Sequence, residues 1–243
     1  MELKNKIVLV TGGAIDVGRQ ISLEMADAGA ILACHYYHSE QAAQTLKETL
    51  TSKGREVCLF KADLRNVAQA TMLIENVIKQ LGTIDVLVNN AAVFFKTPFG
   101  EVEEKEWEQL FALNLKAPFF LSQAASREML RKQSGKIINI GDSGALHPFP
   151  SYLPYSISKA GIMALTRGLA KALAPKIQVN CVNPGPVLFP EDFPPGEKKF
   201  AIEQTLLKRA GTPQDVAKAV RFLIENDYIT GECLAVDGGR HIR

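Results

Sequence analysis

Short apolar runs alternate with longer amphipathic segments along almost the whole chain of 243 residues. The short runs are typical of buried strands, and the longer segments repeat apolar side chains at helical spacing. The predicted strands cover residues 7–10, 31–36, 56–60, 84–88, 136–140, 177–182 and 233–236. The predicted helices cover residues 17–28, 40–53, 67–81, 103–130, 155–173 and 213–224. This alternation predicts one α/β domain over residues 1–243, with a doubly wound parallel sheet of about seven strands and helices on both faces.

Two segments depart from this pattern. Residues 103–130 contain Pro118, which should kink or restart a helix because it lacks a backbone N–H. Residues 184–196 carry five prolines and two carboxylates, which argues against a regular helix or a central strand. Because long irregular segments inside a domain are usually functional, we expect a substrate loop or lid at about residues 184–210. A plain surface loop is the alternative.

Composition narrows the class of protein. The net charge is only +2 and there is no basic stripe, which argues against nucleic acid as a partner. The first apolar run, residues 7–10, is too short for a signal-peptide core, and no run approaches the roughly 20 residues of a membrane span. The four cysteines stand singly, in a spacing that suits neither a metal site nor a disulfide framework. We therefore expect a cytoplasmic protein with reduced thiols and no metal.

Tyr155 and Lys159 are the first candidate catalytic pair. They lie in a predicted helix after the strand 136–140, one helical turn apart and hence on one face. A nearby ammonium favours the phenolate and should lower the pKa of the phenol, so that Tyr155 could donate a proton near neutral pH. A tyrosine and a lysine at this spacing also occur on ordinary solvated helices, so the pair gains meaning only beside a hydride donor.

A glycine-rich turn follows the first strand, in the sequence Thr-Gly-Gly-Ala-Ile-Asp-Val-Gly at residues 11–18. Such a turn lets backbone N–H groups approach a pyrophosphate at the positive end of a helix. Gly12 would make the tight turn and Gly18 would allow close packing of helix on strand. An ordinary strand–helix turn is the alternative.

The second strand ends without the carboxylate that usually binds the ribose 2′-OH of NAD. His38 and Ser39 stand there instead and could hydrogen-bond a 2′-phosphate, which favours NADP; plain surface polarity is the alternative. Asp63 closes the third strand, where it could meet the adenine amine. Carboxyl ends of parallel strands line one crevice, so Asn90, Asp142 and the segment after residue 183 should converge there with Tyr155.

Together these residues resemble the short-chain dehydrogenase/reductase family over nearly the whole chain. The matching positions are Thr11, Gly12, Gly18, Asp63, Asn89, Asn90, Ala91, Asn114, Tyr155, Lys159, Asn183, Pro184, Gly185 and residues 236–239. The resemblance implies a Rossmann-type domain that reduces a small molecule with NAD(P)H, usually as a homotetramer, and the residues after the second strand favour NADP(H). It implies that Tyr155 donates the proton, that Lys159 lowers its pKa and binds the nicotinamide ribose, and that Asn114 holds a water. The implied cofactor groove comprises Gly12, Ile15, Val17, Gly18, His35, His38, Ser39, Asp63, Leu64, Asn90, Ala91, Tyr155, Lys159, Pro184, Gly185 and Val187.

One departure from the common family pattern concerns Asp142, which stands where most members have serine. In this it is similar to pteridine reductases and bacterial dihydromonapterin reductases, in which an aspartate serves the substrate and a phenylalanine stacks on the pterin. Phe94 fits the latter position, so Phe94, Asp142 and Tyr155 form the implied substrate site. Alternatively, Asp142 only caps the strand end and Ser143 takes the serine role. Those enzymes usually have arginine where this chain has Asp16, a carboxylate that would repel phosphate unless it turns away or pairs with Arg19.

The leading hypothesis is therefore an NADPH-dependent reductase of a pterin-type substrate, such as a dihydropterin or dihydrofolate. The alternative is a general short-chain carbonyl reductase acting on an oxoacyl group, a sugar or a steroid ketone. A third hypothesis is an NADP-binding protein without turnover. The intact set of Asn114, Tyr155 and Lys159 argues against it, because a binding protein needs no proton donor.

Overall fold

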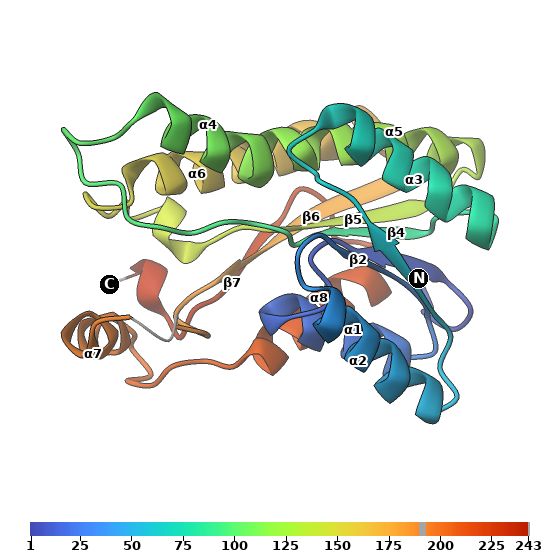
Figure 1. The fold of residues 1–243 in the computed structure, drawn as a ribbon, viewed down its shortest axis with the longest axis horizontal. Coiled ribbons are helices and arrows are strands. Elements are labelled where there is room, and N and C mark those ends of the chain that lie inside the picture. The colour runs from blue at the N-terminus through green and yellow to red at the C-terminus, as the bar shows by residue number, and fades with distance from the viewer. Residues whose placement is uncertain (190–192, 243) are drawn as a thin grey trace.

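The computed structural model describes residues 1–189 and 193–242. Seven strands form one parallel sheet in the order β3-β2-β1-β4-β5-β6-β7 (Figure 1). Their bounds are β1 Ile7–Val10, β2 Ile31–Tyr36, β3 Val57–Lys61, β4 Val86–Asn89, β5 Gly135–Ile140, β6 Ile177–Pro184 and β7 Cys233–Val236. The predicted α/β class and doubly wound topology are confirmed.

Helices cover both faces of the sheet. Their bounds are α1 Asp16–Asp27, α2 Glu40–Ser52, α3 Val67–Leu81, α4 Glu104–Phe111, α5 Ala117–Arg131, α6 Leu153–Leu173, α7 Pro195–Glu203 and α8 Pro213–Glu225. Helices α1, α2 and α8 pack on one face, and α3, α5 and α6 on the other (Figure 1). Strands β1, β4 and β5 are buried along their whole length, as expected of parallel strands covered on both sides. No helix among the described residues is both long and apolar enough to span a bilayer.

The predicted helix 103–130 is interrupted, as Pro118 suggested. A π-helical turn, η1 Ala112–Lys116, separates α4 from α5, and Pro118 lies in the first turn of α5. The π turn leads directly into α5, so the chain stays helical where Pro118, which has no N–H to donate, interrupts the regular hydrogen-bond pattern. Turns of this π type are frequent at functional sites, and this one carries the buried Asn114.

The prediction of irregular structure through residues 184–196 is wrong at both ends. Strand β6 extends to Pro184, which pairs with Val236 of β7 as the last residue of the strand. Helix α7 begins at Pro195, where a proline fits the first helical position. Pro184 thus ends β6 and Pro195 begins α7, so these two prolines mark the limits of the irregular segment. Residues 190–192 of this segment lie outside the described part.

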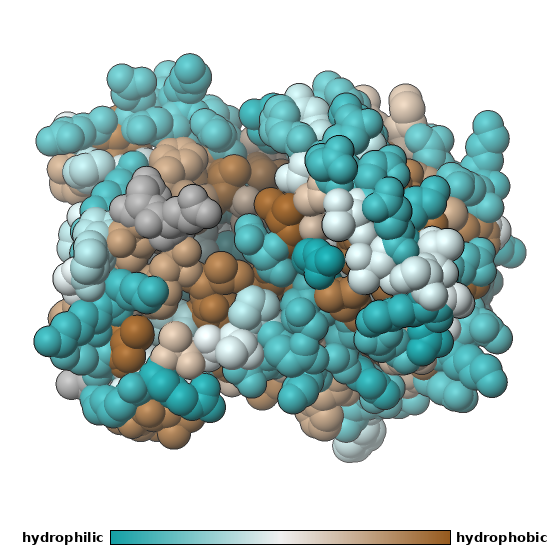
Figure 2. All heavy atoms as spheres, turned by 60° about the horizontal axis from the view of Figure 1, so that its bottom comes forward, coloured by the Kyte–Doolittle hydropathy of each residue, from teal (hydrophilic) through white to brown (hydrophobic). Residues whose placement is uncertain are grey.

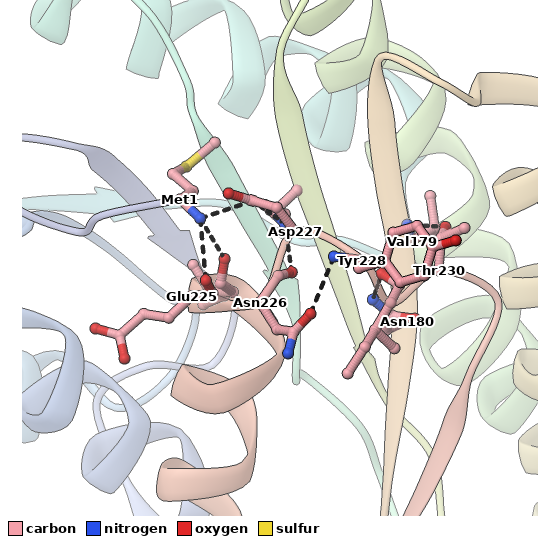
Figure 3. A network of polar contacts seen from close by, with 11 residues as sticks. Met1, Val179, Asn180, Glu225, Asn226, Asp227, Tyr228 and Thr230 are labelled. Atoms are coloured by element: carbon pink, nitrogen blue, oxygen red, sulfur yellow. Dashed lines mark hydrogen bonds and ion pairs between the residues drawn. The ribbon is translucent and has the colours of Figure 1, made fainter.

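A polar network ties the chain together at the amino ends of the strands (Figure 3). The ammonium of Met1 donates to Asp227 Oδ1 at 2.7 Å and to the carbonyls of Ile224 and Glu225. Lys136, only 1% exposed, places its Nζ 2.8 Å from the same Asp227 oxygen and donates to the carbonyl of Asn226. These two cations lower the pKa of Asp227 to about 2. This network lies at the end of the sheet opposite to the carboxyl ends of the strands.

Candidate active site

A hydrogen bond between Tyr155 and Asp142 forms the centre of the candidate site. The phenol of Tyr155, in the first turn of α6, donates to Asp142 Oδ2 at 2.8 Å. Asp142 follows β5 and its Oδ1 accepts from the N–H of Gly144 at 2.5 Å, which caps the short helix η2 Ser143–Ala145. Asp142 thus caps η2, directly after the end of β5, and also contacts the phenol. Ser143 is buried, and its hydroxyl finds no partner among the described residues.

Lys159 lies one turn along α6 from Tyr155, as predicted. Its side chain is buried, its Nζ donates to the carbonyl of Ile140 at 2.9 Å, and it lies 5.9 Å from the centroid of the Tyr155 ring. The ammonium is therefore held by the end of β5, on the inner side of the tyrosine.

Burial dominates the pKa values of this group. It raises the pKa of Asp142 above its ordinary value of 3.8, and it lowers the pKa of Lys159. Burial and then the Asp142 carboxylate raise the pKa of Tyr155 well above 10. The predicted lowering of the Tyr155 pKa by Lys159 is wrong here, because the phenol faces a carboxylate and not the ammonium. The phenol of Tyr155 therefore keeps its own proton at neutral pH and donates it in the hydrogen bond to Asp142.

Asn114 and Phe94 are brought to the same place. The amide of Asn114 donates to the carbonyl of Val93 at 3.0 Å and accepts from its N–H at 2.9 Å, which fixes the chain immediately before Phe94. The ring of Phe94 stacks on Tyr152 at 4.6 Å and meets Tyr155 edge-on at 4.8 Å. Phe94 is still 43% exposed, so an apolar ring borders the phenol while part of its surface remains open.

The glycine-rich turn fits a dinucleotide. A Cβ on Gly18 would lie 2.0 Å from the carbonyl oxygen of Gly12, and Gly12 itself has a φ of +60°. No other residue type could hold helix α1 this close to β1. Among the described residues, the N–H groups of Ala14 and Ile15 donate to no acceptor, and they lie beside the N-terminus of α1. A phosphate group is the natural acceptor for such unpaired donors at the positive end of a helix.

Asn90 and Ala91 hold this turn from the neighbouring strand end. The Asn90 amide donates to the carbonyls of Thr11 and Gly12 at 2.9 and 3.2 Å. The N–H groups of Asn90 and Ala91 both donate to the Thr11 hydroxyl. Asn90 and Ala91, which follow β4, therefore fix the glycine-rich turn that follows β1.

His35 is part of the fold beneath the groove and not part of its surface. It is buried, its Nδ1 accepts from the N–H of Gly12 at 3.0 Å, and its Nε2 donates to the carbonyl of Ala62 at 3.0 Å. Both ring nitrogens are used, so the prediction that His35 binds the cofactor directly is wrong. Burial lowers the pKa of His35 to about 4, and the imidazole is neutral at physiological pH.

This geometry predicts an acid-labile fold. Below pH 6.5 the unfolded chain protonates His35 while the native ring stays neutral down to about pH 4, so stability falls with pH across that window. The free energy of unfolding should drop by about 2 kcal/mol between pH 7 and pH 5 from this group alone. Urea unfolding at the two pH values should show a smaller drop for His35→Gln. The exposed His38→Gln is the control, and an unchanged drop in His35→Gln would contradict this role.

The loop that follows β3 contains an arginine, Arg65, that was not among the residues predicted from the sequence. Arg65 binds Asp63 through both carboxylate oxygens, at 2.9 and 2.7 Å, and lies 5.5 Å over the ring of Tyr37. The pair lowers the pKa of Asp63, so this carboxylate is ionised and already bound. The ring of His38 lies against that of Tyr37 at 3.9 Å with a tilt of 53°, and the Ser39 hydroxyl makes no capping bond to α2. The guanidinium of Arg65 therefore lies near His38 and Ser39, the two residues predicted to contact the 2′-phosphate.

Other residues at the predicted cofactor groove differ in their burial and in their contacts. Leu64 is buried in the apolar core, so its side chain faces away from the groove. Ile15 is 42% exposed at the start of α1. Asp16 has a φ of +52°, a strained value for a non-glycine residue, and it makes no ion pair with Arg19 or any other described cation. Of the two alternatives for Asp16, that it turns away or pairs with Arg19, the ion pair is therefore not formed.

The segment after β6 closes the groove on its other side. Gly185 donates to the carbonyl of Val236 at 3.0 Å, and a Cβ on it would lie 2.7 Å from Asp237 Cα. Val187 packs partly on the core, and beyond it the segment exposes Leu188, Phe200, Leu206 and Leu207. Figure 2 shows apolar side chains gathered on the left and in the centre of this face, with mostly polar groups around them. The lid itself remains a prediction.

Residues 13–241 match the family model described as Enoyl-(Acyl carrier protein) reductase. The 3-oxoacyl-[acyl-carrier-protein] reductase FabG of Staphylococcus epidermidis is 34% identical over 243 residues, covering 98% of this chain and 100% of the relative. The structure of FolM Alternative dihydrofolate reductase 1 from Brucella canis, complexed with NADP, matches with a TM-score of 0.93 at 32% identity, covering 100% of this chain and 96% of that one. A blue fluorescent protein from a metagenomic library, in complex with NADPH, gives a TM-score of 0.93 at 36% identity, with 99% of each chain covered. With matches of this extent, and with Tyr155, Lys159 and the glycine turn at one edge of the sheet, the chain belongs to the short-chain dehydrogenase/reductase family.

Proposed function

We propose that the protein is an NADPH-dependent reductase of a dihydropterin-type substrate. The observation that carries this proposal is the 2.8 Å hydrogen bond from the Tyr155 phenol to the partly buried Asp142. A serine hydroxyl at this position could only orient the phenol. A carboxyl group with a raised pKa can also hold and deliver a proton.

This arrangement suits a substrate whose ring nitrogens need protons. In the proposed mechanism the bound cofactor supplies the hydride, and Tyr155 and Asp142 supply or relay the proton to the reduced ring. Lys159, fixed on the carbonyl of Ile140, places a positive charge behind the phenol. The charge would stabilise the phenolate that forms as the proton leaves.

Phe94 supports a flat substrate. Its ring is partly exposed and already stacks face to face on Tyr152, with Tyr155 at its edge. A planar heterocycle bound against this aromatic surface would present its edge to the phenol. Because Asn114 fixes the preceding residue by two hydrogen bonds, the ring position is set before substrate binds.

A second candidate, a 3-oxoacyl reductase, is favoured by the full-length similarity to FabG of Staphylococcus epidermidis. The similarity to the FolM structure from Brucella canis favours the pterin-type substrate. Asp142 is what leads us to prefer the pterin, because a simple ketone needs one proton at one oxygen and the tyrosine alone can deliver it.

NADP(H) is the proposed cofactor, as in the two similar structures that contain it. The turn at Gly12 and Gly18, with the free N–H groups of Ala14 and Ile15, would hold the pyrophosphate. Arg65, His38 and Ser39 would bind the 2′-phosphate. We further propose self-association, since the stacked Trp107 and Phe111 and the exposed Phe119 leave an aromatic surface on α4 and α5; a homotetramer is the expected form. The four free thiols support a cytoplasmic location.

Cofactor preference gives a direct prediction. The protein should bind NADPH more tightly than NADH, and Arg65→Gln should weaken NADPH binding about tenfold while changing NADH binding little, as expected for a charge-assisted hydrogen bond. Fluorescence titration with both reduced cofactors measures this. Arg55→Gln, before β3 at the far end of the sheet, is the matched control. Tighter binding of NADH by the wild type would show that Asp16 outweighs these contacts.

The proposed activity is tested by NADPH oxidation with a panel of dihydropterins, dihydrofolate, 3-oxoacyl thioesters and simple ketones. We expect turnover with the dihydropterins. Turnover with the 3-oxoacyl thioesters alone would favour the second candidate function, a 3-oxoacyl reductase. No turnover with any compound, together with tight NADPH binding, would favour a binding protein.

A further inference from the structure

The residues after β7 form a rigid turn. The carboxylate of Asp237, itself buried, accepts from the N–H groups of Gly239 and His241 at 2.9 and 2.8 Å and contacts His241 Nδ1 at 2.9 Å. Gly238 and Gly239 have φ values of +64° and +79°, which favour glycine. The turn therefore presents the next residue, Arg240, in a fixed direction within the short helix η3 Arg240–Ile242.

This turn is held between the candidate lid and the loop that carries Asp142. The Nε2 of His147 donates to the carbonyl of His241 at 3.0 Å. On the other side, the N–H groups of Leu206 and Leu207 donate to the carbonyl of Gly238 at 2.9 and 3.2 Å. Figure 1 shows the end of the chain between α7 and the segment that follows β5. Arg240 thus belongs to the border of the active site, although it is far from Asp142 in sequence.

The guanidinium of Arg240 lies 4.8 Å over the ring of Phe149. Phe149 in turn lies against Gly144, where an added Cβ would be 3.1 Å from its ring, and Gly144 donates to Asp142. Within residues 1–189 and 193–242, the Arg240 side chain donates no hydrogen bond and forms no ion pair. Arginine has five N–H donors, and those of this half-buried side chain keep their capacity to donate. The arrangement leaves this side chain ready to bind an acceptor from a ligand.

The chemistry of that acceptor follows from the charges around it. Burial lowers the pKa of Arg240, while the nearby Asp142 and Asp237 act in the opposite direction, so both acidic groups lie close enough to influence its charge. A ligand with a full negative charge would be repelled by these two acidic groups, whereas a neutral carbonyl oxygen would not. We propose that Arg240 is a specificity residue that donates a hydrogen bond to a neutral carbonyl oxygen of the substrate, next to the bond that is reduced. This inference rests on the proposed function for its leading substrate, the ring carbonyl of a dihydropterin, while the thioester carbonyl of a 3-oxoacyl substrate offers the same chemistry.

The test compares Arg240→Met and Arg240→Lys with the wild type, and Arg55→Met serves as the control far from the site. With a dihydropterin, Arg240→Met should raise KM about thirtyfold with kcat nearly unchanged. The KM of Arg240→Lys should lie between those of Arg240→Met and the wild type, because lysine keeps the positive charge but lacks the planar set of N–H donors of the guanidinium. The dissociation constant for NADPH should not move. A 2,4-diaminopteridine, which has an amino group in place of the ring carbonyl, should bind both variants as well as it binds the wild type.

Two outcomes would overturn the inference. One is an unchanged KM in both Arg240 variants accompanied by a lower melting temperature, which would make Arg240 a structural support for Phe149. The other is an equal loss of affinity for the dihydropterin and the diamino compound. If the wild type reduces only 3-oxoacyl thioesters, the proposed function fails, and KM for the thioester then tests Arg240: a rise supports the inference and no rise overturns it.

Discussion

Replacing Tyr155 with phenylalanine is expected to lower kcat by about 10²–10⁴-fold, the range for loss of a general acid. The affinity for NADPH should change less than twofold, because the cofactor is held mainly by other groups. The variant removes the hydroxyl that donates to Asp142 and leaves the ring packed against Phe94. Stopped-flow or steady-state NADPH oxidation measures kcat, and fluorescence titration measures binding.

Tyr228→Phe provides the matched control, because Tyr228 is fully exposed and lies on the loop between α8 and β7. It should have wild-type kinetics. Turnover of Tyr155→Phe close to that of the wild type would remove the tyrosine from the mechanism altogether.

The second large effect concerns Asp142. Asp142→Ser should lower kcat for a dihydropterin about a hundredfold, the low end for a lost general acid, and leave any activity on simple ketones intact or improved. The serine can still orient Tyr155, but it cannot hold a proton for a ring nitrogen. In the wild type, kcat for the pterin should fall as pH rises through the raised pKa of Asp142. A loss of ketone activity equal to the loss of pterin activity would contradict this division of roles.

Asp142 also makes a prediction for stability. Its native pKa is raised, so the native state holds this proton more tightly than the unfolded chain, and stability declines as pH rises through that range. Asp142→Asn keeps an oxygen for the N–H of Gly144 and removes the buried charge. It should therefore be more stable than the wild type at pH 7, with the difference shrinking toward pH 3 in urea unfolding. A lower stability at pH 7 would show that the Asp142 charge is well compensated.

The sequence was sufficient for the features that depend on local spacing. The alternation of short and long segments predicts the sheet, and one turn of helix between Tyr155 and Lys159 predicts their common face. Asn90 and Asp142 follow two paired parallel strands, so their place at one edge of the sheet follows from the rule that parallel strands end together. Even the position of Phe94 beside Tyr155, given by family resemblance, agrees with the structure.

Features that depend on three-dimensional surroundings could not be predicted in this way. His35 looks like a polar residue at a strand end, and only the neighbouring β1 and β3 turn it into a buried link between Gly12 and Ala62. The pKa of Tyr155 depends on which charge the phenol faces, and helical spacing alone does not decide that. Arg65 and Arg240 carry no periodic signal, because each acquires its importance from a residue on another segment: Tyr37 for one and Phe149 for the other.

The central claim is that the Asp142–Tyr155 pair serves a pterin in preference to an oxoacyl group. An internal competition tests it most directly: wild-type protein and limiting NADPH are mixed with equal concentrations of a dihydropterin and a 3-oxoacyl thioester, and both products are quantified. The product ratio equals the ratio of kcat/KM values and is independent of the amount of active protein. We predict that the tetrahydropterin exceeds the hydroxyacyl product at least tenfold. Accumulation of the hydroxyacyl product with the dihydropterin left unreduced would contradict the assignment and identify the protein as an oxoacyl reductase.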